Sequence, residues 1–143
     1  MAAVIDVYRY LDERAPFCIQ MDFDNAGFLV GRGSQTVTKI LVSLDITGQV
    51  VDEAAELGAQ LIVSHHPVIF HPARSITDQE PTGRVLLTLA ERGIAAICAH
   101  TNLDAVAGGV NDVLAARLGL SNIELLRQDG TAPNGMPYGI GRV

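Results

Sequence analysis

The sequence is poor in three features that often identify the class of a protein: cysteines, long apolar runs and basic charge. Its 143 residues include only two cysteines, Cys18 and Cys98, which lack the spacing of a metal-binding motif. So few cysteines argue against a disulfide framework and favour a reducing, cytosolic compartment. No stretch reaches about 18 consecutive apolar residues, so we expect no transmembrane helix. The N-terminal residues lack the basic leader and apolar core of a signal peptide and predict an amphipathic helix instead.

The balance of charge argues against a further class of function. Ten Lys and Arg residues against 16 Asp and Glu residues give a formal net charge of −6. A general nucleic-acid binder would need a basic surface, which this composition does not supply. The sequence also contains no G-x-S-x-G motif of a serine hydrolase, no phosphate-binding G-x-x-x-x-G-K-[ST] loop and no dinucleotide-binding G-x-G-x-x-G. The chemistry of the protein therefore has to come from other side chains.

The apolar residues predict a single α/β domain over residues 1–143. They make up 48% of the sequence, enough for a substantial core in a chain of this length. Their spacing predicts four helices that alternate with four strands, the helices at 4–14, 47–57, 83–92 and 109–118 and the strands at 39–44, 60–64, 94–99 and 123–126. The strands are almost continuously apolar, as expected when both faces are covered. We therefore predict a mostly parallel sheet flanked by helices.

Two shorter segments complete the predicted organisation. Residues 28–30 predict a short extended piece within an otherwise irregular region. Residues 138–143 look like a strand that is just starting, and a domain rarely stops at such a point. We therefore expect the chain to be the N-terminal part of a longer protein.

Polar side chains follow three of the predicted strands. Asp45 follows the first, His65 and His66 follow the second, and the segment from His100 to Asp104 follows the third. The carboxyl ends of parallel strands meet at one edge of a sheet, which is where ligand sites form in such folds. The sequence therefore predicts that these side chains converge.

The segment LIVSHHPVIF, residues 61–70, carries the most specific signal. Neighbouring residues of a regular strand point to opposite faces, so His65 and His66 would be separated if the strand continued. Pro67 ends or bends the strand, which lets both rings face the same edge. Imidazole is the commonest side-chain metal ligand, and two adjacent rings are better placed to bind one ion each than to chelate one. We predict two ions there, with Asp104 as the carboxylate that bridges them.

The histidines and Asp45 also have other interpretations. His-His-Pro is also compatible with a polar loop that contains a turn-forming proline. His71 is predicted to be a surface or gating residue, and His100 to orient a metal ligand or to cap its strand. Asp45 is either an acceptor for a ligating histidine or a charge at the N-terminus of a helix.

Two motifs have a functional and a purely structural interpretation. Asp24 and Asn25, in DFDNAGFLVG, either bind a ligand or form an Asx turn before a short strand. Gly108 and Gly109 either admit a ligand to a helix N-terminus or serve the turn, and turn chemistry is the simpler prediction.

The motifs DNAGFLVG, LDIT, SHHPVIF and AHTNLDAVAGGVND occur in the order and spacing of the Nif-three-like family, whose members are called GTP cyclohydrolase 1 type 2 homologues. The resemblance runs from about residue 5 to residue 143. It implies an α/β Nif-three-like fold, a toroidal homohexamer and a dinuclear metal centre. It also implies that His65, His66 and Asp104 are metal ligands. Two divalent ions per protomer are expected in the complete site, and zinc, iron or manganese suits such ligands.

The chain departs from the family pattern in two places. The family has two further ligands near its C-terminus, a histidine and a glutamate four residues later, and this chain has no His-x-x-x-Glu after Asp104. Phe23 also stands where the family often has tryptophan. The first departure predicts weak or partial metal loading of this chain by itself.

These observations lead to two hypotheses about function. The first is a cytosolic metal-dependent hydrolase that acts on a nucleotide-like or other small substrate, in which His100 or Asp45 moves a proton. The family name suggests opening of the purine ring of GTP, although nothing in the sequence is specific for guanine. The second is a non-catalytic metal-binding, interaction or scaffold protein.

Overall fold

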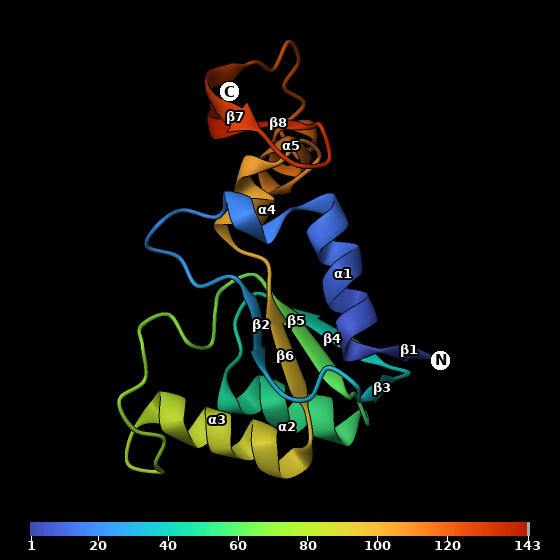
Figure 1. The fold of residues 1–143 in the computed structure, drawn as a ribbon, viewed down its shortest axis with the longest axis vertical. Helices are drawn as coiled ribbons and strands as arrows, with labels where there is room; N and C mark the ends of the chain where they lie inside the picture. The colour runs from blue at the N-terminus through green and yellow to red at the C-terminus, as the bar shows by residue number, and fades with distance from the viewer. Residues whose placement is uncertain (143) are drawn as a thin grey trace.

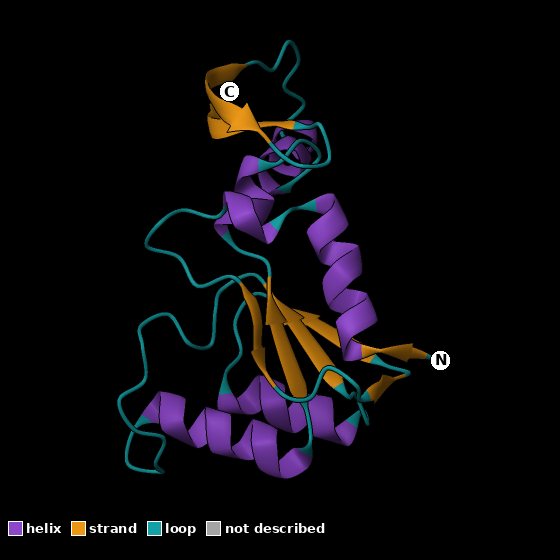
Figure 2. Cartoon of the chain, in the orientation of Figure 1, coloured by secondary structure: helices purple, strands orange, loops and turns teal. Residues whose placement is uncertain are grey.

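The computed structural model describes residues 1–142, which form an α/β fold around a four-stranded sheet (Figures 1 and 2). Across the sheet, the strands lie in the order β2 (Gly27–Val30), β6 (Ala95–Cys98), β5 (Leu61–Ser64) and β4 (Ile40–Ser43). The strands β4, β5 and β6 are parallel, and β2 pairs with β6 in the antiparallel sense. The predicted mostly parallel sheet is therefore confirmed, and the extended piece at residues 28–30 is its antiparallel edge.

The register of the parallel strands aligns their ends. Ser43 of β4 lies opposite Ser64 of β5, and Ser64 lies opposite Cys98 of β6. The residues that follow these three strands therefore leave the sheet at one edge. This is the physical reason why polar segments far apart in the sequence can form one site.

Helices cover both faces of the sheet (Figure 1). One face packs against α2 (Gly48–Glu56) and α3 (Pro81–Arg92), and the other packs against α1 (Val4–Arg14). The side chains of β5 alternate accordingly, with Ile62 in the first layer and Leu61 in the second. Burial of both faces explains why the central strands β5 and β6 have no polar alternation, whereas β4 at the edge exposes Val42.

The helix ends follow the signals in the sequence. The side chain of Thr47 accepts a hydrogen bond from the backbone N–H of Val50 and so caps α2, as predicted. The helix α3 ends at Gly93, which has a left-handed backbone with φ of 64°. Among residues 1–142, no helix has both the length and the apolar composition required to span a lipid bilayer.

The C-terminal third differs from the prediction. A fourth parallel strand at 123–126 was expected, and this expectation was wrong. Only Leu125 and Leu126 of this segment form a strand, and they begin β7 (Leu125–Thr131), which pairs with β8 (Pro137–Arg142) in a separate antiparallel hairpin. The turn residues Asn134 and Gly135 join two strands over a few residues, which is too short for a parallel crossover. A strand near residues 138–143 is confirmed up to Arg142, and Val143 lies outside the described residues.

Two short helices connect the sheet to this hairpin. No helix was predicted between residues 99 and 109, but this segment forms α4 (Thr101–Ala105), which precedes α5 (Val110–Arg117). Beside α4 lies the short 3-10 helix η1 (Phe17–Ile19). Figure 1 shows α4, α5 and the hairpin stacked beyond the carboxyl ends of the parallel strands. Helix α4 thereby holds Asp104 close to the end of β5.

Candidate metal centre

The chain bends immediately after β5. Two side-chain donors satisfy carbonyl groups of the bend: Ser64 Oγ donates to the His66 carbonyl at 2.8 Å, and Cys98 Sγ donates to the His65 carbonyl at 2.9 Å. Pro67 follows without a backbone N–H, so β5 cannot continue as a regular strand. The predicted bend is confirmed, and the donors that hold it come from β5 itself and from the neighbouring strand β6.

Three imidazole rings gather at this bend. The ring centroids of His65 and His66 are 5.1 Å apart, and the ring of His100 lies 5.1 Å from His65 and 5.6 Å from His66. One ligand atom of each residue can be chosen so that all three lie within 4.8 Å of one another. The predicted convergence of the second and third strand ends is therefore confirmed. His100 is a full member of the cluster.

Each of the three rings uses Nδ1 to contact an oxygen atom. His65 Nδ1 lies 3.0 Å from the carbonyl oxygen of Ala99, His66 Nδ1 lies 2.8 Å from Asp45 Oδ1, and His100 Nδ1 lies 2.9 Å from Asp24 Oδ1. A carbonyl or an ionised carboxylate can only accept, so in each neutral ring Nδ1 carries the proton and Nε2 carries the lone pair. Histidines that bind metals commonly have their second nitrogen engaged in this way. The contact with His66 also decides between the two readings of Asp45 in favour of a histidine partner.

Asp104 lies beside the first histidine. Its Oδ1 is 3.6 Å from His65 Nε2, which is within the range of an ion pair and longer than a good hydrogen bond. The carboxylate is only partly exposed and comes from α4, whereas His65 comes from the end of β5. The predicted pair of His65 and Asp104 therefore lies together, in an arrangement that leaves room for an ion to contact both.

The least expected member of the site is Asp24. Its side chain is 0% exposed, and it accepts hydrogen bonds from the His100 ring, the Thr101 hydroxyl and the Thr101 backbone N–H. Burial by itself would raise the pKa of this carboxyl. The hydrogen bonds from Thr101 and His100, with one from the backbone N–H of Asn25, outweigh burial and hold the pKa of Asp24 below its usual value. Asp24 was predicted either to bind a ligand or to form an Asx turn. In the structure its carboxylate accepts a hydrogen bond from the ring of His100.

Asn102 was not singled out from the sequence, yet it fixes the same segment. Its side chain is fully buried, accepts a hydrogen bond from the His100 backbone N–H at 2.9 Å and donates to the Ala15 carbonyl at 2.6 Å. A buried amide needs such partners, because an unpaired one would lose hydration without compensation. Its position in the polar run His100–Asp104, after a buried strand, was the only signal in the sequence.

The remaining predicted residues lie apart from the histidine cluster or serve the backbone. His71 is exposed, and its ring packs against Phe70 with the centroids 4.9 Å apart. Gly108 has φ of 77°, and a Cβ on Gly109 would lie 1.9 Å from the carbonyl oxygen of Leu103. The glycine pair is therefore explained by the tight connection between α4 and α5, as turn chemistry predicted.

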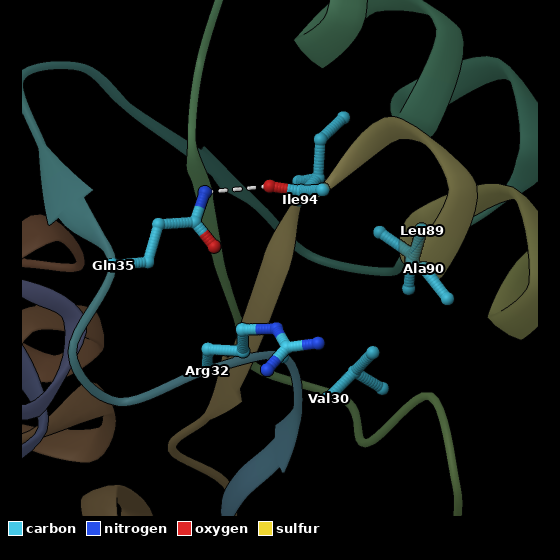
Figure 3. A pocket seen from close by; sticks show the side chains of 8 residues that line it. Val30, Arg32, Gln35, Leu89, Ala90 and Ile94 are labelled. Carbon is cyan, nitrogen blue, oxygen red and sulfur yellow. Dashed lines mark hydrogen bonds between the residues drawn. The ribbon is translucent and has the colours of Figure 1, made fainter.

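A cavity of about 480 Å³ lies at the other end of the sheet. Its lining includes Val30, Arg32, Leu89 and Ile94, and Figure 3 shows the Gln35 amide donating a hydrogen bond beside it, to the Gly93 carbonyl. The cavity faces the segment that enters β6, whereas the histidines follow the carboxyl ends of β5 and β6. None of the described residues that line it belongs to a cluster of metal-binding side chains. The histidine cluster is therefore the better candidate for chemistry, although this cavity is larger than the one of about 350 Å³ beside His66.

Comparisons with known proteins agree on one family. The family model for Duf34/NIF3 (NGG1p interacting factor 3) matches residues 2–143. A protein of Clostridium perfringens (strain 13 / Type A) named GTP cyclohydrolase 1 type 2 homolog is 38% identical over 138 residues, which cover 96% of this chain and 52% of the relative. A protein of the same name from Halalkalibacterium halodurans is 40% identical over 84% of this chain and 32% of its own length. The chain spans about half of the length of these curated relatives, or less.

Solved structures show the same fold. A Bacillus cereus protein related to NIF3 superposes with a TM-score of 0.86 at 36% identity, over 91% of this chain and 36% of that protein. Reduced HcgD from Methanocaldococcus jannaschii superposes with a TM-score of 0.79 at 29% identity, over 93% of this chain and 51% of that protein. The expected Nif-three-like fold is therefore confirmed.

Proposed function

Since this chain belongs to the Duf34/NIF3 family, we propose that it binds divalent metal ions at the carboxyl edge of its sheet, as part of a metal-dependent hydrolase. His65, His66 and Asp104 are the proposed ligands, with Asp104 between two ions in the complete centre. The observation that carries the proposal is the cluster of imidazoles whose Nδ1 atoms are all engaged by oxygen acceptors.

The donor set fits a divalent transition metal. Each neutral ring offers Nε2, and the Asp104 carboxylate lies 3.6 Å from His65 Nε2, where one ion can contact both side chains after a small adjustment. Imidazole together with carboxylate suits zinc, iron or manganese. The oxygen partners Asp45 and Ala99 would orient the rings of His66 and His65 and raise their basicity.

A bound ion would supply Lewis-acid polarisation and would activate water for attack on an electrophilic carbon or phosphorus. The chain itself contributes orientation and proton handling. Asp45 is half-exposed and contacts a proposed ligand, so it is placed to exchange protons with solvent at the mouth of the site. The open cavity of about 350 Å³ beside Asp45 and His66 gives a small substrate access to this edge.

The proposed substrate is a small electrophile of nucleotide-like chemistry. The relatives' name points to GTP, while the polar side chains that line this cavity, those of Asp45, Thr47, His66 and Thr82, could hydrogen-bond to many small substrates. We therefore propose the reaction class, hydrolysis, in preference to a particular substrate.

The proposal is tested by metal binding and turnover in matched variants. The protein is titrated with Zn²⁺ and Mn²⁺, and hydrolysis of nucleotides and phosphoesters is followed with each metal. His65→Ala and Asp104→Ala should each lower metal affinity by more than about 100-fold and abolish turnover. His71→Ala, which removes an exposed histidine outside the cluster, should change neither. Stoichiometric metal binding without turnover of any substrate would support the alternative of a metal-binding or scaffold protein, and absence of metal binding would refute both.

We further propose that the protein acts in the cytosol as a homo-oligomer, a toroidal hexamer when complete. Support comes from an apolar groove of about 430 Å³ between α1 and β4, which is lined by Val42 with an exposed fraction of 76%, and from the position of β4 at the edge of the sheet. An apolar edge strand of this kind favours pairing with a second copy. Light scattering should show an assembly that Val42→Glu disrupts, whereas a concentration-independent monomer would contradict the proposal.

A further inference from the structure

We propose that the cavity of about 480 Å³ at the other end of the sheet binds a free α-amino acid with an apolar side chain. Arg32 pairs with the carboxylate of this ligand, the amide oxygen of Gln35 accepts a hydrogen bond from its ammonium group, and the apolar lining receives its side chain. None of these residues belongs to the histidine cluster, so the inference goes beyond the proposed function and does not rest on it.

The first support is a guanidinium group without a protein partner. Figure 3 shows the side chain of Arg32 among the residues that line the cavity. Within residues 1–142, no carboxylate lies within ion-pair distance of Arg32, and its side chain donates no hydrogen bond. An unpaired arginine is notable in a chain with a formal net charge of −6. Its forked N–H donors match the two oxygens of a carboxylate.

The second support is the backbone that carries this arginine. Gly31 has φ of 113°, and a Cβ there would lie 2.7 Å from the Cβ of Ala95, so glycine allows the chain to approach the start of β6 closely. The carbonyl of Arg32 then accepts a hydrogen bond from the backbone N–H of Gln35 at 3.1 Å. Arg32 and Gln35 therefore come from one short turn that is held against the sheet.

The third support is the orientation of the Gln35 amide. Its Nε2 donates to the carbonyl of Gly93 at 2.6 Å, and because a carbonyl can only accept, the amide oxygen is left as a free acceptor. Figure 3 shows this oxygen on the side of the amide that faces Arg32. Gly93 follows the last turn of α3, where the helix carries partial negative charge. This side of the cavity therefore suits a cationic donor and disfavours a doubly charged anion such as phosphate.

The fourth support is the apolar part of the lining. Val30, Ala90, Leu89 and Ile94 supply it, and Leu89 and Ile94 belong to the hydrophobic core between the sheet and the helices α2 and α3. This wall is therefore rigid, and the volume lies within the range of small-molecule sites. A cation, a neutral acceptor and an apolar wall correspond to the carboxylate, the ammonium group and the side chain of an amino acid such as leucine.

Isothermal titration with L-leucine and three analogues tests this correspondence in the wild-type chain. Removal of the ammonium group in 4-methylpentanoate, or of the carboxylate in 3-methylbutylamine, should weaken binding by at least about 10-fold, because each loses a charge-assisted hydrogen bond. N-acetyl-L-leucine, which imitates the C-terminus of a peptide, should also bind weakly. Absence of leucine binding would overturn the inference. Equal affinity for any of the analogues would contradict a site for the free amino acid.

Variants locate the site. Arg32→Ala should weaken leucine binding by about 10- to 100-fold, and Ala90→Trp should abolish it by filling the cavity from the exposed side of α3. Arg92→Ala is the matched control, because it removes the same charge from an exposed residue of α3 that does not line the cavity. Circular dichroism reports whether each variant folds. Wild-type affinity in both Arg32→Ala and Ala90→Trp would refute this site.

The affinity for Zn²⁺, measured in the same variants, separates this inference from the proposed function. It should stay at the wild-type value in all three, because the cavity lies away from the histidines. A wild-type chain that binds leucine but no metal would refute the proposed function and leave the amino-acid site in place. A chain that binds metal but no leucine would do the reverse.

Discussion

At the scale of single residues, burial and hydrogen bonding decide the chemistry, and they act in opposite directions on two neighbours. Asp24 is buried but receives several hydrogen bonds to its charged form, so the pKa of its carboxyl is lowered. Cys98 is also buried, and desolvation, followed by the nearby negative charge of Asp24, raises the pKa of its thiol to about 12. The same environment therefore keeps one group ionised and the other neutral.

The two cysteines should differ sharply in reactivity. Cys18 is exposed, whereas Cys98 is fully buried and its pKa of about 12, against 9.0 for an ordinary thiol, reduces its thiolate fraction at pH 8 by about 1000-fold. We expect a maleimide reagent to modify Cys18 within minutes and Cys98 only after unfolding in urea. Mass spectrometry of digested peptides measures both sites. Equal labelling in the folded protein would contradict the burial of Cys98.

At the scale of elements, two glycines at the starts of helices differ in whether the surrounding structure has room for a side chain. Gly109, at the start of α5, has an ordinary φ of −79°, yet a Cβ there would collide with the carbonyl oxygens of Leu103 and Val106. Gly48 begins α2, and a Cβ there would meet nothing within 4 Å. The connection between α4 and α5 thus depends on a missing side chain, and α4 carries Asp104.

A pair of alanine substitutions tests this difference. Gly109→Ala should lower the free energy of unfolding by about 2 kcal/mol or more, because backbone atoms have to move. Gly48→Ala should leave it unchanged or raise it by up to about 1 kcal/mol, because alanine favours the helix and restricts the unfolded chain. Urea denaturation measures both variants. A Gly109→Ala protein as stable as the wild type would show that the α4–α5 connection can relax freely.

At the scale of the whole molecule, the central strands β5 and β6 form the frame of the site. Leu61 of β5 is 0% exposed and packs in the layer between the sheet and α1. The histidines follow directly from these strands, so their separation depends on the packing of both faces. The hairpin of β7 and β8 lies in a separate sheet and contributes no residue to the histidine cluster.

Two leucines provide a matched test of this division. Leu61→Ala should cost about 2–5 kcal/mol of stability, because it leaves a cavity in the core of the sheet. Leu126→Ala removes the same atoms from a side chain in β7 that is 73% exposed, and it should change stability by less than about 0.5 kcal/mol. Denaturation followed by circular dichroism gives both values. Comparable losses would mean that Leu126 is covered in solution, for example by a second copy of the chain.

The sequence by itself determined the parallel part of the fold and the edge that carries the site. Apolar periodicity and caps such as Thr47 are local signals, and parallel strands necessarily end on one side, so the grouping of His65, His66 and Asp104 was accessible from the pattern. The role of Asp45 was left open until the structure showed its contact with His66. The hairpin was misplaced because the short run at 123–126 does not reveal which strand it will pair with.

Only the tertiary structure decided which oxygen holds each ring and that His100 joins the cluster. Asp24 and His100 are 76 residues apart, and no local pattern links them. Their contact depends on how the loop before β2 packs against the start of α4, where hydrogen bonds from His100 and from the hydroxyl and backbone N–H of Thr101 compensate for burial of the carboxylate. Side-chain pairing across the fold is set by packing, and packing is a property of the complete three-dimensional arrangement.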